Sequence, residues 1–307
     1  MSDKKPAAPA KNPTHEVLRA IGIPAGAGRW VVPGVIGLAI LGGTGWGLWS
    51  FIEPHLTSGP HYTLNPQDIS LTQLPAWIKT DLRGEALRNA GLDGPLSILD
   101  PQLAERLYKA FEMHPWVAKV ERVTKLSPNR VEVALVYRKP VCMVEVPGGL
   151  FPVDERGVLL PSSDFSPIEA QRYPRLSDIQ TVTEGPVGTE WRDPHVPGAA
   201  RLAAVLLDAW TELQLDRIAP AAAAGSPSSL GEPEFELFTK GGSRIVWGRA
   251  PGSTASNEPP PADKLARLRR YAKEQGSLDG PKGPQQLDLR HGGELTPAPR
   301  TASKPAK

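Results

Sequence analysis

The stretch that decides the fold covers residues 114–137 and reads HPWVAKVERVTKLSPNRVEVALVY. Apolar and polar residues alternate over Val117–Leu126 and again over Arg130–Tyr137, which is typical of strands with one buried face. The Ser-Pro-Asn sequence at residues 127–129 separates the two runs and consists of turn-forming residues. The pattern therefore predicts two neighbouring strands joined by a tight turn.

Two helices and a further strand are predicted on the N-terminal side of this pair. Apolar residues recur at helical spacing over residues 74–87, and again from the N-cap candidate Asp100 to Phe111. A strand over residues 62–71 precedes both helices. The order strand, helix, helix, strand, strand predicts a compact α+β unit at residues 62–138, with helices covering one face of its sheet.

On the C-terminal side the pattern predicts a β-rich domain over residues 139–293. Its expected elements are strands at 141–146, 151–153 and 158–160, a helix at 201–215, strands at 235–238 and 244–247, a helix at 263–274, and a last strand at Leu287–Arg290. Residues 221–229 and 250–261 read as loop insertions, and residues 294–307 as a disordered tail.

Composition excludes several classes of protein. The chain has 30 glycines and 34 prolines among 307 residues, about one residue in five against roughly one in eight on average, which indicates many turns and linkers. Its formal net charge of +2 is too small for a protein that binds nucleic acid through phosphates, so no nucleic-acid partner is expected. Cys142 is the only cysteine, which rules out an intrachain disulfide and favours a packed apolar role.

An uncharged stretch runs from Trp30 to Ile52. As a helix it would be about 34 Å long, enough to cross a hydrocarbon core of about 30 Å. We expect an uncleaved transmembrane helix rather than a signal peptide, because the stretch exceeds the usual apolar core of a signal peptide. Within it, Gly43 and Gly47 have the spacing that allows two membrane helices to pair.

The charges around this stretch predict its orientation. Before it stand five lysine or arginine residues against two acidic ones, whereas the next basic residue after it is Lys79. By the positive-inside rule we expect a single-pass protein of the cell inner membrane, with its C-terminal domains extracytoplasmic, that is, periplasmic. Residues 1–29 would then be a disordered basic cytoplasmic tail and residues 53–61 a linker.

The sequence contains no pattern typical of a catalytic or metal site. The six histidines are scattered, none forming an i, i+4 pair with a glutamate between, and there is no phosphate loop, dinucleotide fingerprint or Gly-x-Ser-x-Gly. Asp154 and Glu155 lie in a predicted turn, where local hydrogen bonding is the expected role. Trp116 and Trp247 are expected to be packed core residues. We therefore predict a non-enzymatic protein without a cofactor or metal.

Several short motifs follow one another in a characteristic order. They are His-Pro-Trp-Val at 114–117, Ser-Pro-Asn-Arg-Val-Glu-Val at 127–133, Arg-Lys-Pro-Val at 138–141, the turn Val153–Gly157, the segment Tyr173–Leu176, and Asp-Leu-Arg at 288–290. Together they resemble the bacterial cell-division protein family FtsQ/DivIB, over most of the chain from Trp30 to about Gly293. The chain departs from that family at His291, where tyrosine is common, and at Pro297, where the strand that follows His291 stops early.

The resemblance implies a fold class and a function. The expected fold class is α+β, with one N-terminal transmembrane helix, a POTRA-like β-α-α-β-β domain at 62–138 and a β-rich partner-binding domain at 139–293. The expected function is a membrane-anchored scaffold of the divisome that acts in septum formation. Its implied partners are FtsL-like and FtsB-like proteins, which are single-span coiled-coil proteins captured chiefly by extending the C-terminal sheet.

Strand addition needs a sheet edge, because only an edge offers unpaired backbone donors and acceptors. The last predicted strand is the best candidate, and the candidate partner-binding residues are Leu287, Asp288, Leu289, Arg290, His291 and Gly293. Charges at Asp288 and Arg290 would equally serve to prevent aggregation at that edge. The basic helix at 263–274, which includes Lys264, is expected to be a solvated face, with acidic partners or lipid headgroups as the alternative.

Two other functions stay open on the sequence. The alternative to the scaffold is a different POTRA-bearing protein, one that handles or translocates polypeptides at the cell envelope. A membrane-tethered cell-wall enzyme is the third class, and it would need a nucleophile or metal constellation.

Overall fold

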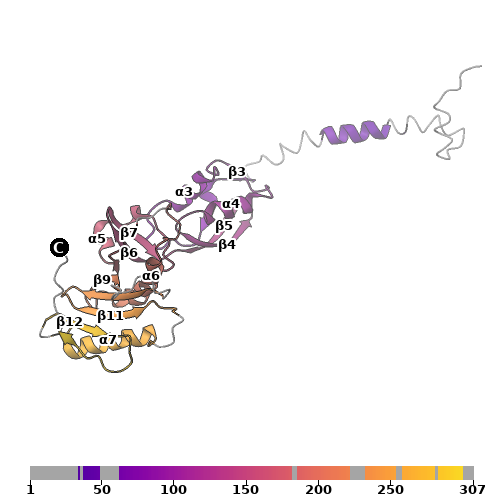
Figure 1. Ribbon diagram of the computed structural model, residues 1–307. Helices are drawn as coiled ribbons and strands as arrows, with labels where there is room; N and C mark the ends of the chain where they lie inside the picture. Colours follow the sequence, from indigo (N-terminus) through magenta and orange to yellow (C-terminus); the bar gives the residue numbers. More distant parts are fainter. Residues whose placement is uncertain are drawn as a thin grey trace, which may run out of the picture. The chain divides into compact units, whose positions relative to one another are not determined.

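The computed structural model describes residues 34, 37–48, 62–181, 185–221, 232–253, 258–280 and 283–299. The chain divides into two compact units, Met1–Thr63 and Leu64–Lys307. The three-stranded and eight-stranded sheets described below belong to the second unit, and Figure 1 labels many of its elements.

The first unit corrects the predicted fold class, which placed a transmembrane helix at Trp30–Ile52. The continuous helix that is described there covers residues 37–48. None of the helices in the described residues combines the length and the apolar character that crossing a membrane requires. The predicted tail at 1–29 and linker at 53–61 lie outside the described residues. The described residues form a mixed α/β fold.

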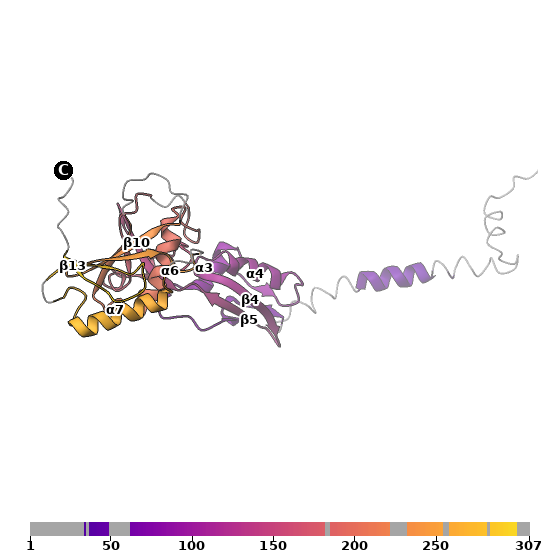
Figure 2. The same ribbon diagram turned by 60° about the horizontal axis from the view of Figure 1, so that its bottom comes forward.

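A three-stranded sheet forms the N-terminal part of the second unit. It contains β2 (Ile69–Leu71), β4 (Val117–Leu126) and β5 (Arg130–Tyr137) in the order β2-β5-β4. β4 and β5 have the bounds that their alternation predicted, because one face of each is buried in a shared core. The helices α3 (Leu82–Asn89) and α4 (Leu103–Glu112) cover one side of these strands (Figure 2). The two helices and the last two strands follow in the predicted order, whereas the strand predicted over residues 62–71 is interrupted by the 3-10 turn Pro66–Asp68, and a short strand, Leu96–Ser97, lies between the helices.

The first of these helices begins later than the pattern at residues 74–87 predicted. Asp81 caps α3, accepting a hydrogen bond of 3.1 Å from the Gly84 amide. Before it the chain turns, with the Ile78 amide donating to the Pro75 carbonyl at 3.1 Å. Apolar residues at helical spacing here pack into the core from a turn, which periodicity alone does not distinguish from a helix.

An eight-stranded mixed sheet forms the larger part of the unit, in the order β13-β12-β11-β10-β9-β8-β6-β7. Its strands are β6 (Pro140–Val146), β7 (Gly149–Asp154), β8 (Arg175–Leu176), β9 (Leu215–Pro220), β10 (Glu234–Thr239), β11 (Arg244–Arg249), β12 (Gln285–Asp288) and β13 (Ala298–Pro299). The helices are α5 (Pro167–Ala170), α6 (His195–Leu206) and α7 (Pro261–Gln275). Minor elements are β1 (Thr63–Leu64), β3 (Leu96–Ser97) and the 3-10 turns Pro66–Asp68, Ser162–Asp164 and Leu207–Ala209.

The core of the large sheet contains side chains from α6, α7 and most of the strands, including the fully buried Trp247. Trp116 is fully buried in the other core, so both tryptophans are core residues as predicted. The predicted helix at 201–215 is wrong at its C-terminal end, because α6 ends at Leu206 and Leu215 opens β9 instead. Most of the predicted insertion at 221–229 lies outside the described residues, as does part of that at 250–261.

Candidate functional site

The strand β12 lies near one end of the large sheet and is held there by β11. The two strands run parallel, with Gln286, Leu287 and Asp288 opposite Arg244, Ile245 and Val246. The pairing continues to the Leu289 amide, which donates to the Val246 carbonyl at 2.9 Å. Backbone direction alternates along a strand. The amides of Gln286 and Asp288 therefore face away from β11, and we call this outward backbone the β12 edge.

Within the described residues, another strand covers only the first half of the β12 edge. β13 runs antiparallel to β12, with Pro299 opposite Gln285 and Ala298 opposite Gln286. The same register would place Thr296 opposite Asp288, but Thr296 lies outside the strand. The structure therefore corrects the prediction that residues 294–307 are all disordered, since a short strand lies within them, and it leaves Asp288 beyond the β13 ladder.

The six predicted partner-binding residues do not form one surface. Leu287 and Leu289 are fully buried and belong to the core, whereas Asp288 and Arg290 lie on the opposite face of the strand. His291 and Gly293 follow in an exposed turn, where Gly293 has a φ of +107° that favours glycine. The predicted last strand at Leu287–Arg290 is thus shifted, because β12 starts at Gln285 and ends at Asp288.

Asp288 and Arg290 form a charge pair at the end of β12. The Arg290 Nη2 atom lies 2.7 Å from Asp288 Oδ2, and the Arg290 amide donates to Asp288 Oδ1 at 3.0 Å. Partial burial raises the pKa of Asp288, but the hydrogen bonds from Arg290 and the nearby positive charges together lower it by more, so the carboxyl pKa lies below its ordinary value. The hydrogen bond to Asp288 likewise raises the pKa of Arg290. Glu234 on β10 is a more distant partner, 4.0 Å from Arg290 Nη1.

The helix α7 reaches the same end of the sheet, which the sequence did not indicate. Arg267 donates through Nη1 to the His291 carbonyl at 2.7 Å. A groove runs between the helix and the chain after His291, lined by Tyr271, Leu295 and Pro297 among others. Leu295 is buried and joins the core of the large sheet. The segment that ends in β13 is therefore anchored by an apolar contact.

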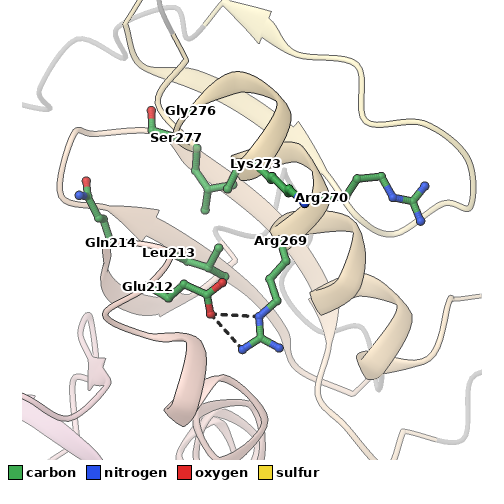
Figure 3. A pocket seen from close by; sticks show the side chains of 10 residues that line it. Glu212, Leu213, Gln214, Arg269, Arg270, Lys273, Gly276 and Ser277 are labelled. Atoms are coloured by element: carbon green, nitrogen blue, oxygen red, sulfur yellow. Dashed lines mark hydrogen bonds and ion pairs between the residues drawn. The ribbon is translucent and has the colours of Figure 1, made fainter.

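The basic face of α7 is less uniform than predicted. Lys264 is almost fully buried: its ammonium donates to the Trp247 carbonyl at 2.7 Å and pairs with Glu258. Figure 3 shows Arg269 directed at Glu212, with an ion pair of 3.0 Å, while Arg270 points to the other side of the helix. The surrounding pocket has a volume of about 530 Å³ and is lined by acidic and basic side chains. Lys264 is thus a structural residue rather than part of a solvated face.

The other groups singled out in the sequence have structural surroundings. Burial raises the pKa of the Cys142 thiol to about 12, so it stays protonated and a weak nucleophile. His114 is buried, with its Nε2 atom 3.4 Å from Glu85 Oε2, and burial lowers the pKa of its imidazole. Asp154 accepts from the amides of Arg156 and Val158 at 2.9 Å, the turn role that was predicted. In the part of the chain that is described, no three His, Cys, Asp or Glu residues are grouped to hold a metal.

No protein-family model matches the chain, and no curated protein matches its sequence. What the site can do therefore follows from its own geometry. A strand held firmly on one side and half covered on the other can accept an additional strand through backbone hydrogen bonds. The Asp288–Arg290 pair beside it can exchange partners with a charged side chain.

Proposed function

We propose that the chain is a non-enzymatic scaffold of the bacterial divisome, which captures other division proteins by strand addition at the β12 edge. The partners suggested by the motif resemblance are FtsL-like and FtsB-like coiled-coil proteins. The observation that carries this proposal is that the outward backbone of β12 is only half covered. Its pairing with β13 stops at Gln286, whereas its pairing with β11 continues to Leu289.

Burial of neighbouring side chains supports this use of the edge. Leu287 and Leu289 are fully buried, so they hold β12 in its extended form before any partner arrives. Such pre-organisation reduces the entropy lost on binding. Arg290 adds selectivity, because its guanidinium can make paired hydrogen bonds to a partner carboxylate in place of Asp288. An extracytoplasmic location of these domains stays a prediction.

The test replaces Asp288 with proline in the full chain. Proline lacks the amide that faces outward at this position, yet it leaves the Leu289 bond to β11 in place and is tolerated at sheet edges. The matched control is Leu150→Pro on β7, at the opposite end of the sheet. Binding is measured with the purified complex of the FtsL-like and FtsB-like proteins of the same bacterium, in detergent.

We expect Asp288→Pro to weaken binding at least about thirtyfold, the scale of an interface hot spot of about 2 kcal/mol. Leu150→Pro should leave affinity unchanged. Equal affinity of Asp288→Pro and the unaltered chain, at equal thermal midpoints, would show that the partners bind elsewhere. Binding of unfolded polypeptides in place of the coiled-coil complex would favour a polypeptide-handling role instead.

A further inference from the structure

We propose that residues 295–299 are a built-in occupant of the β12 edge, which a partner strand must displace in order to bind. The inference rests on the proposed function and adds a way in which binding at the same site is regulated. Its starting point is that β13 pairs with the outward backbone of β12, at Gln285 and Gln286, on the side where strand addition would take place.

The hydrogen-bonding capacity of β13 is low. Proline has no backbone amide, and prolines at 297 and 299 leave Ala298 as the one donor in the last three described residues. Ala298 faces Gln286. An incoming strand without prolines could pair with Gln286 and also with Asp288, which β13 does not reach. The partner therefore has more backbone hydrogen bonds available at this edge than the segment that covers it.

The segment is nevertheless held close to the edge. Gly293, with its positive φ, lets the chain reverse after β12, and Arg267 fixes the reversal through the His291 carbonyl at 2.7 Å. Leu295 then buries its side chain in the core. Because the segment is tethered, it competes at a high effective concentration even though each of its contacts is weak. Displacement requires only that Leu295 leaves its site and β13 unpairs.

This arrangement predicts an effect on affinity in both directions. When a site is occupied by a tethered segment, the apparent affinity for a partner equals the intrinsic affinity multiplied by the fraction of molecules in which the site is open. Fixing β13 in place should reduce binding, and weakening β13 should increase it. Both changes can be made without altering Asp288 and Arg290, which would also contact the partner.

A reversible lock tests the first direction. Gln286→Cys combined with Ala298→Cys places two thiols on directly opposed residues, whose Cα atoms in such antiparallel pairs are about 5.5 Å apart, within the range of a disulfide. The native Cys142 is fully buried and will not interfere. Gln286→Cys alone, treated with the same oxidant, is the control. The probe is the same FtsL-like and FtsB-like complex as above.

We expect the oxidised double variant to bind at least tenfold more weakly than its reduced form, and reduction to restore binding. Ala298→Pro, which removes the remaining donor of β13, should bind several-fold more tightly than the unaltered chain. Equal binding of the oxidised and reduced forms would overturn the inference while the proposed function stands. Failure of the folded double variant to form the disulfide would also overturn it. If neither the unaltered chain nor the reduced variant binds, the proposed function fails, and the inference with it.

Discussion

The two ends of the large sheet are closed in different ways. At the β7 end, the chain returns directly after a tight turn, and the Leu160 amide donates to the Pro152 carbonyl at 2.8 Å while Leu159 pairs with Val153. At the β12 end, two residues of β13 cover the edge after a longer excursion. The first closure is made by backbone that follows β7 closely in the sequence, and the second by a two-residue strand that contains a proline. The comparison indicates a permanent end and an exchangeable end.

The charge pairs at the two ends of the sheet differ in how far they are exposed to solvent. Arg138 and Asp154 near β7 have side chains only 15% and 8% exposed and lie 2.8 Å apart. Arg290 and Asp288 at β12 are 41% and 37% exposed. Removing one partner of a buried pair leaves an uncompensated charge, whereas an exposed pair exchanges readily with water and salt. The polar contacts therefore fix one end and leave the other adaptable.

The largest expected effect is at the permanent end. Asp154→Ala should lower the free energy of unfolding by about 3 to 5 kcal/mol, because Arg138 and the amides of Arg156 and Val158 lose their acceptor together. Urea denaturation of the full chain measures this. Glu155→Ala, at the adjacent exposed carboxylate, is the control and should change stability by less than about 0.5 kcal/mol. Similar losses for both variants would contradict the role assigned to Asp154.

A smaller effect is expected from the apolar anchors of the two covering segments. Leu160 is fully buried in the core shared with Trp116, so Leu160→Ala should lower the unfolding free energy by about 3 kcal/mol. Leu295→Ala should lower it by about 1 kcal/mol or less, because its segment can detach without unfolding the sheet. Thermal and urea unfolding compare the two variants. Equal losses would show that the β12 end is as firmly closed as the β7 end.

The smallest effect is expected at the exposed charge pair. Since the pKa of Asp288 is lowered in the folded chain, the pair stabilises the fold above the ordinary aspartate pKa of about 4, and this contribution is lost as the pH falls through the lower folded-state value. Arg290→Ala should therefore reduce stability by less than about 1 kcal/mol at pH 7. The difference from the unaltered chain should shrink below about pH 4. A difference that grows on acidification, measured by urea unfolding at several pH values, would contradict this assignment.

Where local pattern and burial agree, the sequence predicted the elements well. The strands at 117–126 and 130–137 and the helix near 263–274 follow from alternation or helical spacing with one buried face. Prediction failed where apolar residues pack from irregular backbone. Ile78 is buried from a turn, and Gln214 adopts a φ of +52° that ends the helical region before β9. The transmembrane helix predicted at Trp30–Ile52 is wrong as far as the described residues go, because none of their helices is long and apolar enough to cross a membrane.

The candidate site was only partly predictable. The Asp-Leu-Arg motif located the end of β12 to within two residues, since buried Leu287 and Leu289 alternate with polar neighbours. β13 carries no such signal, because a two-residue strand containing a proline has neither periodicity nor strand propensity. The Arg267 contact to the His291 carbonyl joins residues distant in sequence, and nothing local indicates it.

Hydrogen–deuterium exchange of the full chain, free and bound to the FtsL-like and FtsB-like complex, tests strand addition at the β12 edge most directly. The account predicts that binding slows exchange in peptides covering residues 285–291, because the outward amide of Asp288 would become paired and that of Gln286 would pair with the partner in place of β13. Exchange in residues 149–154 at the β7 end should stay unchanged, and exchange in residues 295–299 should become faster as β13 is displaced. Protection confined to another region, such as β4, with residues 285–291 unaffected, would contradict it.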